Sequence, residues 1–371
     1  MRIPFSDIGG KNCFMQNVKL TVYLSTYNQE EYVAQALDSI LMQKTDFPFE
    51  VIVADDCSTD KTQSIILEYQ KDFPLKIRTY FTLENVGGCQ KLVNCIDGGY
   101  FNGEYIALLE GDDYWLDENR LQVLVDFLDQ NPKYSRVSHK RLVIDENNQE
   151  KGFDIPNDVL NKPFYIEDFL EGKQYSDFGS VFRNYYIEAG SKYNRLLLAS
   201  RNVCDFQDMF ITQDFGPVYV MDQCFGVYRS RSIPGATNYN SIMSQKKRCI
   251  ENIHLAHAVE QFYAGKYDLT LMIRNNQRRL LAEAVNTCDS DYFNDCRKYM
   301  SSEIMDELLA EQIYLAWRGK RKEQISFIKT HVDKGEITKL VNDFVMYFLA
   351  RVRNKLMGKE TNNKARGVIK N

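Results

Sequence analysis

Glu104-Tyr-Ile-Ala-Leu-Leu-Glu-Gly-Asp-Asp-Tyr-Trp115 is the stretch that decides the fold. Its first half, Tyr105–Leu109, is an apolar run short enough to be a fully buried strand. The run then breaks at Gly111, inside an acidic cluster of Glu110, Asp112 and Asp113. Carboxylates crowded at the end of a buried strand are costly, and a bound cation or a reacting ligand is the usual reason for them. The alternative is an acidic turn that caps the next helix.

Strand-like and helix-like patterns alternate on both sides of this stretch. Three further segments are apolar and of strand length, and each is followed by buried positions at helical spacing. The predicted strands are residues 18–25, 49–54 and 77–81. The predicted helices are residues 30–43, a segment with Ile65, Ile66 and Tyr69, a segment with Leu92, Val93 and Ile96, and residues 117–129. Four strand–helix units with short loops predict an α/β fold, with a mainly parallel, Rossmann-like sheet and helices on both faces.

Ligands of such sheets bind beyond the carboxyl ends of the strands. The polar residues that follow the four predicted strands therefore belong to one edge, and they are Ser25–Asn28, Asp55–Ser58, Asn85–Gly88 and Glu110–Asp113. The chain has neither GxGxxG nor GxxxxGK[ST], so it lacks the dinucleotide fingerprint and the P-loop. A phosphate ligand would instead need a divalent cation held by the carboxylates, and oxygen ligands favour Mg²⁺ or Mn²⁺.

Composition narrows the class of protein. With 371 residues, of which 44% are hydrophobic, the chain can bury one large or two medium cores. A net charge of −5 gives no support to a nucleic-acid partner. Nine cysteines without a CxxC pair argue against a zinc site or a disulfide framework. We find no apolar signal segment and no run of eighteen apolar residues, and therefore expect a cytoplasmic protein without a membrane-spanning helix.

Four motifs together resemble those of family 2 glycosyltransferases, in both order and spacing. They are Leu24–Asn28, Val51–Asp60, Glu84–Gly87 and Leu109–Trp115, and the close match covers about residues 18–130. The resemblance implies a GT-A fold and the inverting transfer of a sugar from a nucleotide-sugar donor, expected to be a UDP-sugar. The acceptor it implies is a growing surface polysaccharide or a lipid-linked glycan.

The resemblance also implies which residues bind the nucleotide. Thr26 and Tyr27 match the residues that cradle the base after the first strand. Asp56 looks like the carboxylate that accepts a hydrogen bond from the uracil imide, and Asp55 beside it is expected to share this role. An aromatic ring suits stacking on a base, and a carboxylate suits that N–H donor. The alternative for Tyr27 is a ring packed under the loop.

Three further residues fall near the expected ribose and diphosphate. Asn85 and Asn94 match polar positions of the family there, although ordinary helix packing also accounts for Asn94. Lys91 would offset the charge of the diphosphate, or would be a solvated surface lysine.

Asp112 and Asp113 fit the metal-and-ribose end of the family's DxD element. Glu110 stands where an aspartate often leads that element, which is a departure from the common pattern. Its longer side chain can still reach a metal or hold a bound water. The resemblance therefore implies Mn²⁺ or Mg²⁺ bound by Asp113, Asp112 and Glu110.

Inverting transfer needs a base that takes the proton of the acceptor hydroxyl. The segment Asp205–Gly216, followed by Val218–Asp222 and a Tyr-Arg pair at Arg229, resembles the second half of the family pattern. It implies Asp205 as the base, with Asp208 one turn later as the second choice. The alternative for Asp205 is a carboxylate stabilised by the helix dipole. Arg231 stands where family members often have a histidine.

Helical patterns alone follow residue 239. We therefore expect an N-terminal extension (residues 1–17), a GT-A domain (residues 18–238) and an α-helical C-terminal region (residues 239–371). The last predicted helix, from about Ile337, has a broad apolar face and a basic end. That end would make a peripheral contact with the inner face of an anionic membrane, or the helix packs on the core and carries a basic tail.

Two other functions fit part of the pattern. A nucleotidyltransferase also pairs an α/β sheet with a carboxylate-bound metal, but it would need a Gly-rich basic loop where Ser25–Asn28 stands. A non-catalytic scaffold that binds nucleotide-sugars would share the donor motifs and would lack a usable base.

Overall fold

The computed structural model describes residues 17–175, 179–202, 204–230 and 243–332. The chain divides into two compact units, residues 1–241 and 242–371, and each is described by itself. The domain boundaries expected at 17/18 and 238/239 stay predictions. Arg231, the helix expected from Ile337 and the basic end of the chain lie outside the described residues.

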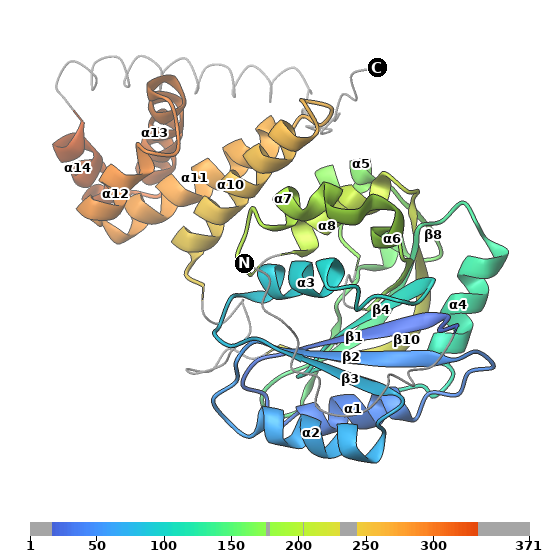
Figure 1. The fold of residues 1–371 in the computed structure, drawn as a ribbon. Helices are drawn as coiled ribbons and strands as arrows, with labels where there is room; N and C mark the ends of the chain where they lie inside the picture. Colours follow the sequence, from blue (N-terminus) through green and yellow to red (C-terminus); the bar gives the residue numbers. More distant parts are fainter. Residues whose placement is uncertain (1–16, 176–178, 203, 231–242, 333–371) are drawn as a thin grey trace. The chain divides into compact units, whose positions relative to one another are not determined.

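The first unit is built on one ten-stranded sheet (Figure 1). Its strands are β1 (Leu20–Thr26), β2 (Phe49–Asp55), β3 (Ile77–Phe81), β4 (Tyr105–Glu110), β5 (Tyr114–Trp115), β6 (Arg136–Ile144), β7 (Glu150–Phe153), β8 (Lys162–Phe164), β9 (Val181–Arg183) and β10 (Val218–Arg229). The order is β3-β2-β1-β4-β9-β6-β10-β5, with β7 paired to β6 and β8 paired to β10. Strands β3, β2, β1 and β4 run parallel, whereas β9 is antiparallel to both β4 and β6.

Helices cover the sheet on both faces, with α1 and α2 on one side and α3 on the other (Figure 1). The helices of this unit are α1 (Val33–Leu41), α2 (Thr62–Asp72), α3 (Gly88–Asp97), α4 (Arg120–Gln130), α5 (Ile166–Leu170), α6 (Tyr186–Ala189), α7 (Asn194–Leu197) and α8 (Asp205–Gln213), with two 3₁₀ turns, η1 (Asn157–Val159) and η2 (Gly190–Tyr193). The predicted fold class is thereby confirmed, because the parallel strands and their covering helices are those that the sequence pattern indicates.

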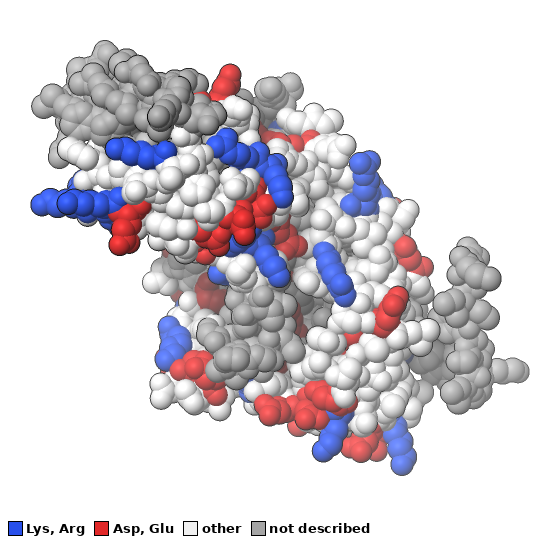
Figure 2. Space-filling view, turned by 90° about the vertical axis from the view of Figure 1, so that its left-hand side faces the viewer, with Lys and Arg blue, Asp and Glu red and all other residues white. Residues whose placement is uncertain are grey.

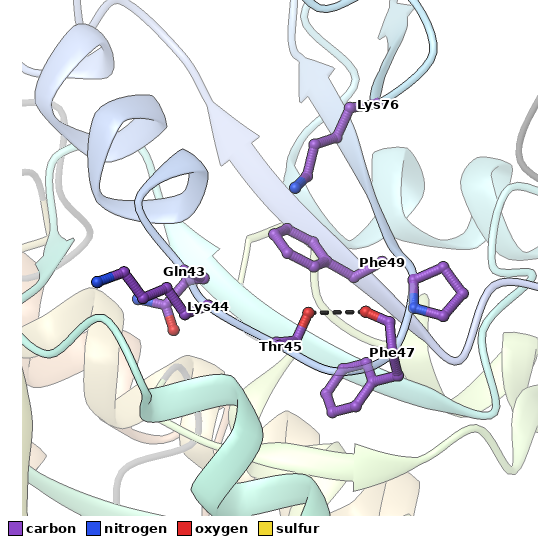
Figure 3. Close-up of a pocket in the computed structure, with 7 residues that line it drawn as sticks. Gln43, Lys44, Thr45, Phe47, Phe49 and Lys76 are labelled. Carbon is purple, nitrogen blue, oxygen red and sulfur yellow. Dashed lines mark hydrogen bonds between the residues drawn. The ribbon is translucent and has the colours of Figure 1, made fainter.

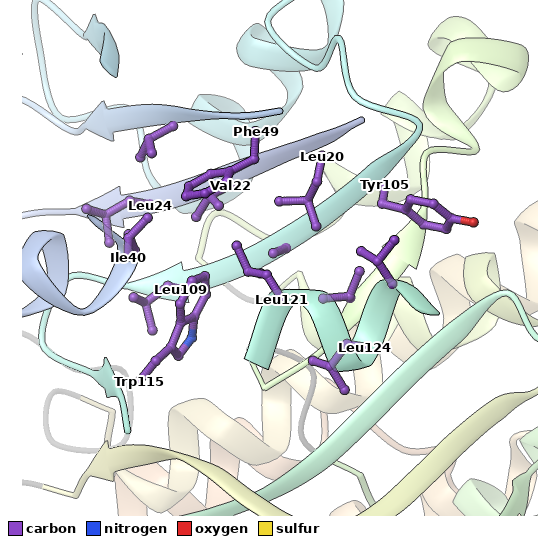
Figure 4. Close-up of a cluster of buried hydrophobic side chains, with 14 of the residues drawn as sticks. Leu20, Val22, Leu24, Ile40, Phe49, Tyr105, Leu109, Trp115, Leu121 and Leu124 are labelled. Atoms are coloured by element: carbon purple, nitrogen blue, oxygen red, sulfur yellow. The ribbon is translucent and has the colours of Figure 1, made fainter. Parts of the chain in front are cut away.

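One apolar core joins the sheet to α1 and α4. Alternate residues of β1, Leu20, Val22 and Leu24, lie on one face of the sheet. They belong to the same buried cluster as Ile40 of α1 and Leu121 of α4 (Figure 4). Burying each such side chain contributes about 1.5–3 kcal/mol. Every residue of β2 is buried, as expected of a central strand covered on both faces. This core holds the strand ends, and the polar residues after them, in fixed positions.

The second unit is helical in its described part. It contains α10 (Gln245–Phe262), α11 (Thr270–Thr287), α12 (Ser290–Cys296), α13 (Ser302–Arg318) and α14 (Lys322–His331). Leu280 and Leu281 of α11, Phe293 of α12 and Leu308 of α13 share its core. Within the described residues, no helix combines the length and the apolar composition that crossing a membrane requires. On the face shown in Figure 2, basic and acidic side chains are interspersed, without the continuous basic field of nucleic-acid-binding proteins.

Candidate functional site at the carboxyl edge of the sheet

The strand ends bring the predicted site residues to one edge of the sheet. In the parallel register, Thr26 of β1 lies beside Asp55 of β2, and Ser25 lies beside Glu110 of β4. The segment between β3 and α3 joins them: the backbone N–H of Thr82 donates to the carbonyl of Asp55, and those of Val86 and Gly87 donate to the Asp56 carboxylate. Segments separated by up to about 85 positions in sequence therefore meet at one place.

Asp55 is fully buried, and its hydrogen bonds stabilise this edge of the sheet. Its Oδ1 accepts from Thr26 Oγ1 at 2.8 Å and from Ser58 Oγ at 2.5 Å. Its Oδ2 accepts from the backbone N–H of Ser58 at 2.9 Å and from Gln63 Nε2 at 2.7 Å. A carboxylate has about four acceptor positions. All four are used here, so Asp55 holds the base-side loop together and has no position left for a ligand.

Asp56 orders the turn before α3. Its Oδ1 accepts from Thr82 Oγ1 at 3.1 Å and from the Val86 N–H at 2.9 Å, and its Oδ2 accepts from the Gly87 N–H at 2.8 Å. These are three of about four acceptor positions. One position of Asp56 therefore remains for a ligand N–H.

The other donor-side residues differ in exposure. Tyr27 is half-buried at the edge, while Asn85 is exposed and accepts a hydrogen bond from Arg201. Asn94 accepts from Gln90 Nε2 within α3 at 2.8 Å. Lys91 is buried, not solvated: its Nζ donates to Ser25 Oγ at 3.1 Å and to the Thr26 carbonyl at 3.0 Å.

Burial lowers the pKa of Lys91, while the carboxylates of Asp56, Asp55 and Glu110 act in the opposite direction. The ammonium group is thus a positive charge fixed beneath the edge. It ties the end of β1 to α3, and its field extends toward the acidic cluster.

The acidic cluster follows β4 in a tight turn. Asp112 and Asp113 are buried, and Glu110 is partly exposed. Burial, with Asp112, Asp113 and Asp205 adding to it, raises the pKa of Glu110 well above its usual range. Burial also raises the pKa of Asp113 to about 7, and it outweighs the lowering effect of Arg141. The surrounding residues therefore do not fully offset the cost of ionising Glu110 and Asp113.

Two arginines hold this cluster, and sequence reasoning gave neither of them that role. Arg141 of β6 donates from Nη1 to Asp113 Oδ2 at 2.9 Å and from Nε to Asp154 at 2.8 Å. The backbone N–H of Arg229, at the end of β10, donates to Asp113 Oδ1 at 2.9 Å. The Arg229 side chain donates to the Asp112 carbonyl at 3.2 Å and to Gln35 at 2.6 Å. The Tyr-Arg pair at the end of β10 was the available signal for Arg229, whereas nothing in the local pattern marked Arg141.

The three carboxylates predicted to hold a metal follow β4 together, but their surroundings differ. Both oxygens of Asp113 are bound to Arg141 and Arg229. The carboxylate of Glu110 accepts no hydrogen bond from the described part of the chain, and Glu110 is partly exposed. No group of three His, Cys, Asp or Glu side chains is arranged to hold a metal among the described residues. The carboxylate oxygens of this cluster are of the ligand type that suits a hard divalent cation.

Asp205 and Asp208 occupy different environments on α8. Asp208 is buried and accepts from Arg136 Nη2, from the Tyr185 hydroxyl at 2.8 Å and from the Tyr186 hydroxyl at 3.2 Å. Asp205 begins the helix, and its carboxylate reaches solvent without a partner in the described residues. Desolvation by nearby protein, with the charge of Asp208, nevertheless raises the pKa of Asp205. The charge of Asp205 contributes to the raised pKa of Glu110, so Asp205 lies on the side of the acidic cluster.

A cavity of about 380 Å³ lies elsewhere. It is lined by Gln43, Lys44, Thr45, Phe47, Pro48, Phe49 and Lys76 (Figure 3). Phe49 is the first residue of β2, and Asp55 is the last. A strand of seven residues spans about 20 Å, so the cavity belongs to the opposite edge of the sheet from the site.

Comparisons with known proteins agree with the geometry. Residues 21–189 match the family described as Glycosyl transferase family 2. An uncharacterised protein of Mycobacterium tuberculosis is 41% identical over 127 residues, which are 34% of this chain and 36% of that protein. The poly(ribitol-phosphate) beta-N-acetylglucosaminyltransferase TarS of Staphylococcus aureus is 36% identical over 116 residues, 30% of this chain and 19% of TarS. This chain thus spans well under half the length of these relatives.

Likeness to solved structures extends further along the chain. Residues 1–349 of Staphylococcus aureus TarS, solved in complex with UDP-GlcNAc, superpose with a TM-score of 0.55 and 17% identity. The superposition covers 85% of this chain and 90% of the TarS fragment. Residues 21–189 are therefore similar to glycosyl transferase family 2, and the superposition shows a fold of the GT-A type.

Proposed function

We propose that this chain is a glycosyltransferase that moves a sugar, with inversion, from a UDP-sugar to a glycan or lipid-linked acceptor. The observation that carries the proposal is the meeting of the four strand-end motifs at one edge, with the Asp205 carboxylate close enough to act on Glu110. The relative TarS is an N-acetylglucosaminyltransferase that was solved with UDP-GlcNAc, which supports a UDP-sugar as the donor.

On the donor side, Tyr27 and Asp56 are the groups with free binding capacity. The half-buried ring of Tyr27 offers a face for the uracil base. Asp56 has one acceptor position left, which suits the uracil imide N–H. Asp55, whose acceptor positions are all used, supports the loop that carries both residues.

A divalent cation, Mn²⁺ or Mg²⁺, fits beside Glu110 and Asp112. When bound, it would supply positive charge that stabilises the diphosphate leaving group. Asp113 would hold the turn in place through Arg141 and Arg229, and by the same count of acceptor positions its oxygens could still reach the cation. Lys91 would add fixed positive charge beneath the same edge.

Asp205 is the proposed base. Its carboxylate would take the proton of the acceptor hydroxyl while that oxygen attacks the anomeric carbon. The bond from this carbon to the phosphate oxygen breaks, and UDP leaves on the opposite face, which inverts the configuration. A raised pKa makes Asp205 a better proton acceptor. Asp208 is a poor alternative, because its carboxylate is buried against Arg136.

The remaining expectations concern the rest of the chain. We propose a cytoplasmic protein whose helical C-terminal region follows the GT-A domain. A peripheral contact with the inner face of the membrane would come from the basic end of the chain, and it would place the enzyme near lipid-linked acceptors.

The test is release of free nucleotide from a panel of nucleotide-sugars by the purified chain, with Mn²⁺ and with EDTA as the metal-free control. We expect UDP from one or more UDP-sugars, with the rate lost in EDTA. Binding of UDP-sugars without any release of UDP would favour a non-catalytic scaffold. Release of pyrophosphate from a nucleoside triphosphate would favour a nucleotidyltransferase.

A further inference from the structure

The segment just before Asp205 is fastened to the turn that opens α3. Arg201 Nη2 donates to the carbonyl of Asn85 at 2.6 Å and to Asn85 Oδ1 at 2.7 Å. The backbone N–H of Cys89 donates to the Arg201 carbonyl at 3.1 Å. The thiols of Cys204 and Cys89 lie 2.7 Å apart. Side chain, backbone and thiol contacts therefore all join the same two pieces of chain.

Gly87 shows how closely these pieces approach each other. Its φ of +91° is unfavourable for any residue with a side chain. A Cβ atom there would lie 2.4 Å from Arg201 Cγ and 2.6 Å from the Arg201 carbonyl oxygen. On its other side the Gly87 N–H binds Asp56 at 2.8 Å. The turn is thus held between Asp56, on the nucleotide side, and Arg201, on the side of α8.

The position of the Asp205 carboxylate depends on this fastening. Asp205 has no side-chain partner among the described residues, so only the placement of α8 fixes it. One turn later Asp208 anchors the helix to Arg136, at a different place from the contacts of Arg201. Cys204, directly before Asp205, lies against α3.

We propose that Arg201 is a positioning residue: by binding Asn85, it ties the nucleotide-side turn to the start of α8 and holds Asp205 opposite the donor. This inference rests on the proposed function, in which Asp205 is the base. The Nη2 of Arg201 is committed to two acceptors of Asn85, so this nitrogen acts through that residue.

Turnover of a UDP-sugar by single and double variants tests the coupling. Arg201→Ala and Asn85→Ala should each lower kcat by about 10-fold or more, because a small displacement of a reacting group has effects of that order. The double variant should be no slower than either single one, since both remove the same tie. KM for the donor should change by less than about 3-fold. Losses that multiply in the double variant would overturn the proposal, and so would an effect of Arg201→Ala on KM alone.

Asn194→Ala is the matched control. Asn194 of α7 donates to both oxygens of Asp97 at 2.9 Å, and so it also binds α3, but at the far end of that helix. It should leave kcat within about 2-fold of the parent chain. If it slowed turnover as much as Arg201→Ala, general packing against α3 would account for the effect, and the proposal would fail.

A second readout does not depend on activity. Oxidised glutathione can join Cys89 and Cys204, the two thiols giving up two electrons and two protons as the oxidant becomes two molecules of glutathione. The rate at which this disulfide forms, followed by mass spectrometry, reports how well the start of α8 stays in contact with α3. It should fall in Arg201→Ala and Asn85→Ala and persist in Asn194→Ala. An unchanged rate in Arg201→Ala would refute the positioning role even if the parent chain showed no turnover, which would count against the proposed function only.

Discussion

Replacing Asp208 by alanine removes the shared acceptor of three buried donors. The donors are Arg136 Nη2 and the hydroxyls of Tyr185 and Tyr186. The Arg136 side chain has no exposed surface, so its charge cannot turn to water once the carboxylate is gone. Breaking a buried pair in this way costs about 3–5 kcal/mol of unfolding free energy. We take the middle of that range, because Arg136 keeps hydrogen bonds to Ser180 and Tyr185.

Urea unfolding measures this loss. With a slope of about 2 kcal/mol per M, a loss of about 4 kcal/mol moves the midpoint down by about 2 M. Asp205→Ala, on the same helix but at the surface, is the matched control and should shift stability by less than about 1 kcal/mol. The double change Arg136→Met with Asp208→Leu should recover most of the loss, because it removes both charges. A loss below about 1 kcal/mol in Asp208→Ala would refute a structural role for Asp208 and would return it to consideration as a base.

Three further predictions concern the nucleotide edge and the acidic cluster. Because the pKa of Asp113 is raised to about 7, the folded state holds this proton to higher pH than the unfolded state, so stability from this group is lost as pH rises from about 4 to about 7. The melting temperature without metal should fall over that range, and Mn²⁺ should raise it more at pH 7.5 than at pH 5. The variant Asp113→Asn should flatten the pH dependence of the melting temperature. A steeper dependence in that variant would contradict the assignment of this titration to Asp113. Tyr27→Ala should weaken UDP binding about 5- to 150-fold in calorimetry through lost stacking, with Tyr27→Phe close to the parent chain, and equal affinities would exclude stacking. Arg229→Met should lower the unfolding free energy by about 1–3 kcal/mol, since Gln35 and the Asp112 carbonyl lose their donor, and an unchanged urea midpoint would argue against this link.

The parts of the fold that follow from local pattern were predictable. Apolar runs of strand length, each followed by buried positions at helical spacing, indicate the β1–β4 units and the edge where their ends meet. The sequence predicts Asp56 as the acceptor for the uracil imide and lets Asp55 share this role. Neighbouring side chains at a strand end point to opposite faces, and only the structure shows that the acceptor positions of Asp55 are used up inside.

The arginines of the site were beyond prediction for a different reason. Arg141 lies 28 positions from Asp113, and Arg136 lies 72 positions from Asp208. Arg201 and Asn85 are 116 positions apart. Such pairs depend on how β6, β10 and α8 are placed by the whole sheet, and no local pattern encodes them. For the same reason the sequence did not show that Asp113, the predicted metal ligand, also accepts hydrogen bonds from Arg141 and Arg229.

The central claim is that Asp205 takes the proton of the acceptor at an edge that binds a UDP-sugar. Its most direct test is turnover of the accepted UDP-sugar by Asp205→Asn, with UDP affinity measured on the same protein. We predict a rate at least about 100-fold lower, as expected when a general base is lost, with UDP affinity within about 3-fold of the parent chain. Turnover equal to that of the parent chain would contradict the assignment of the base and, with it, this account of the site.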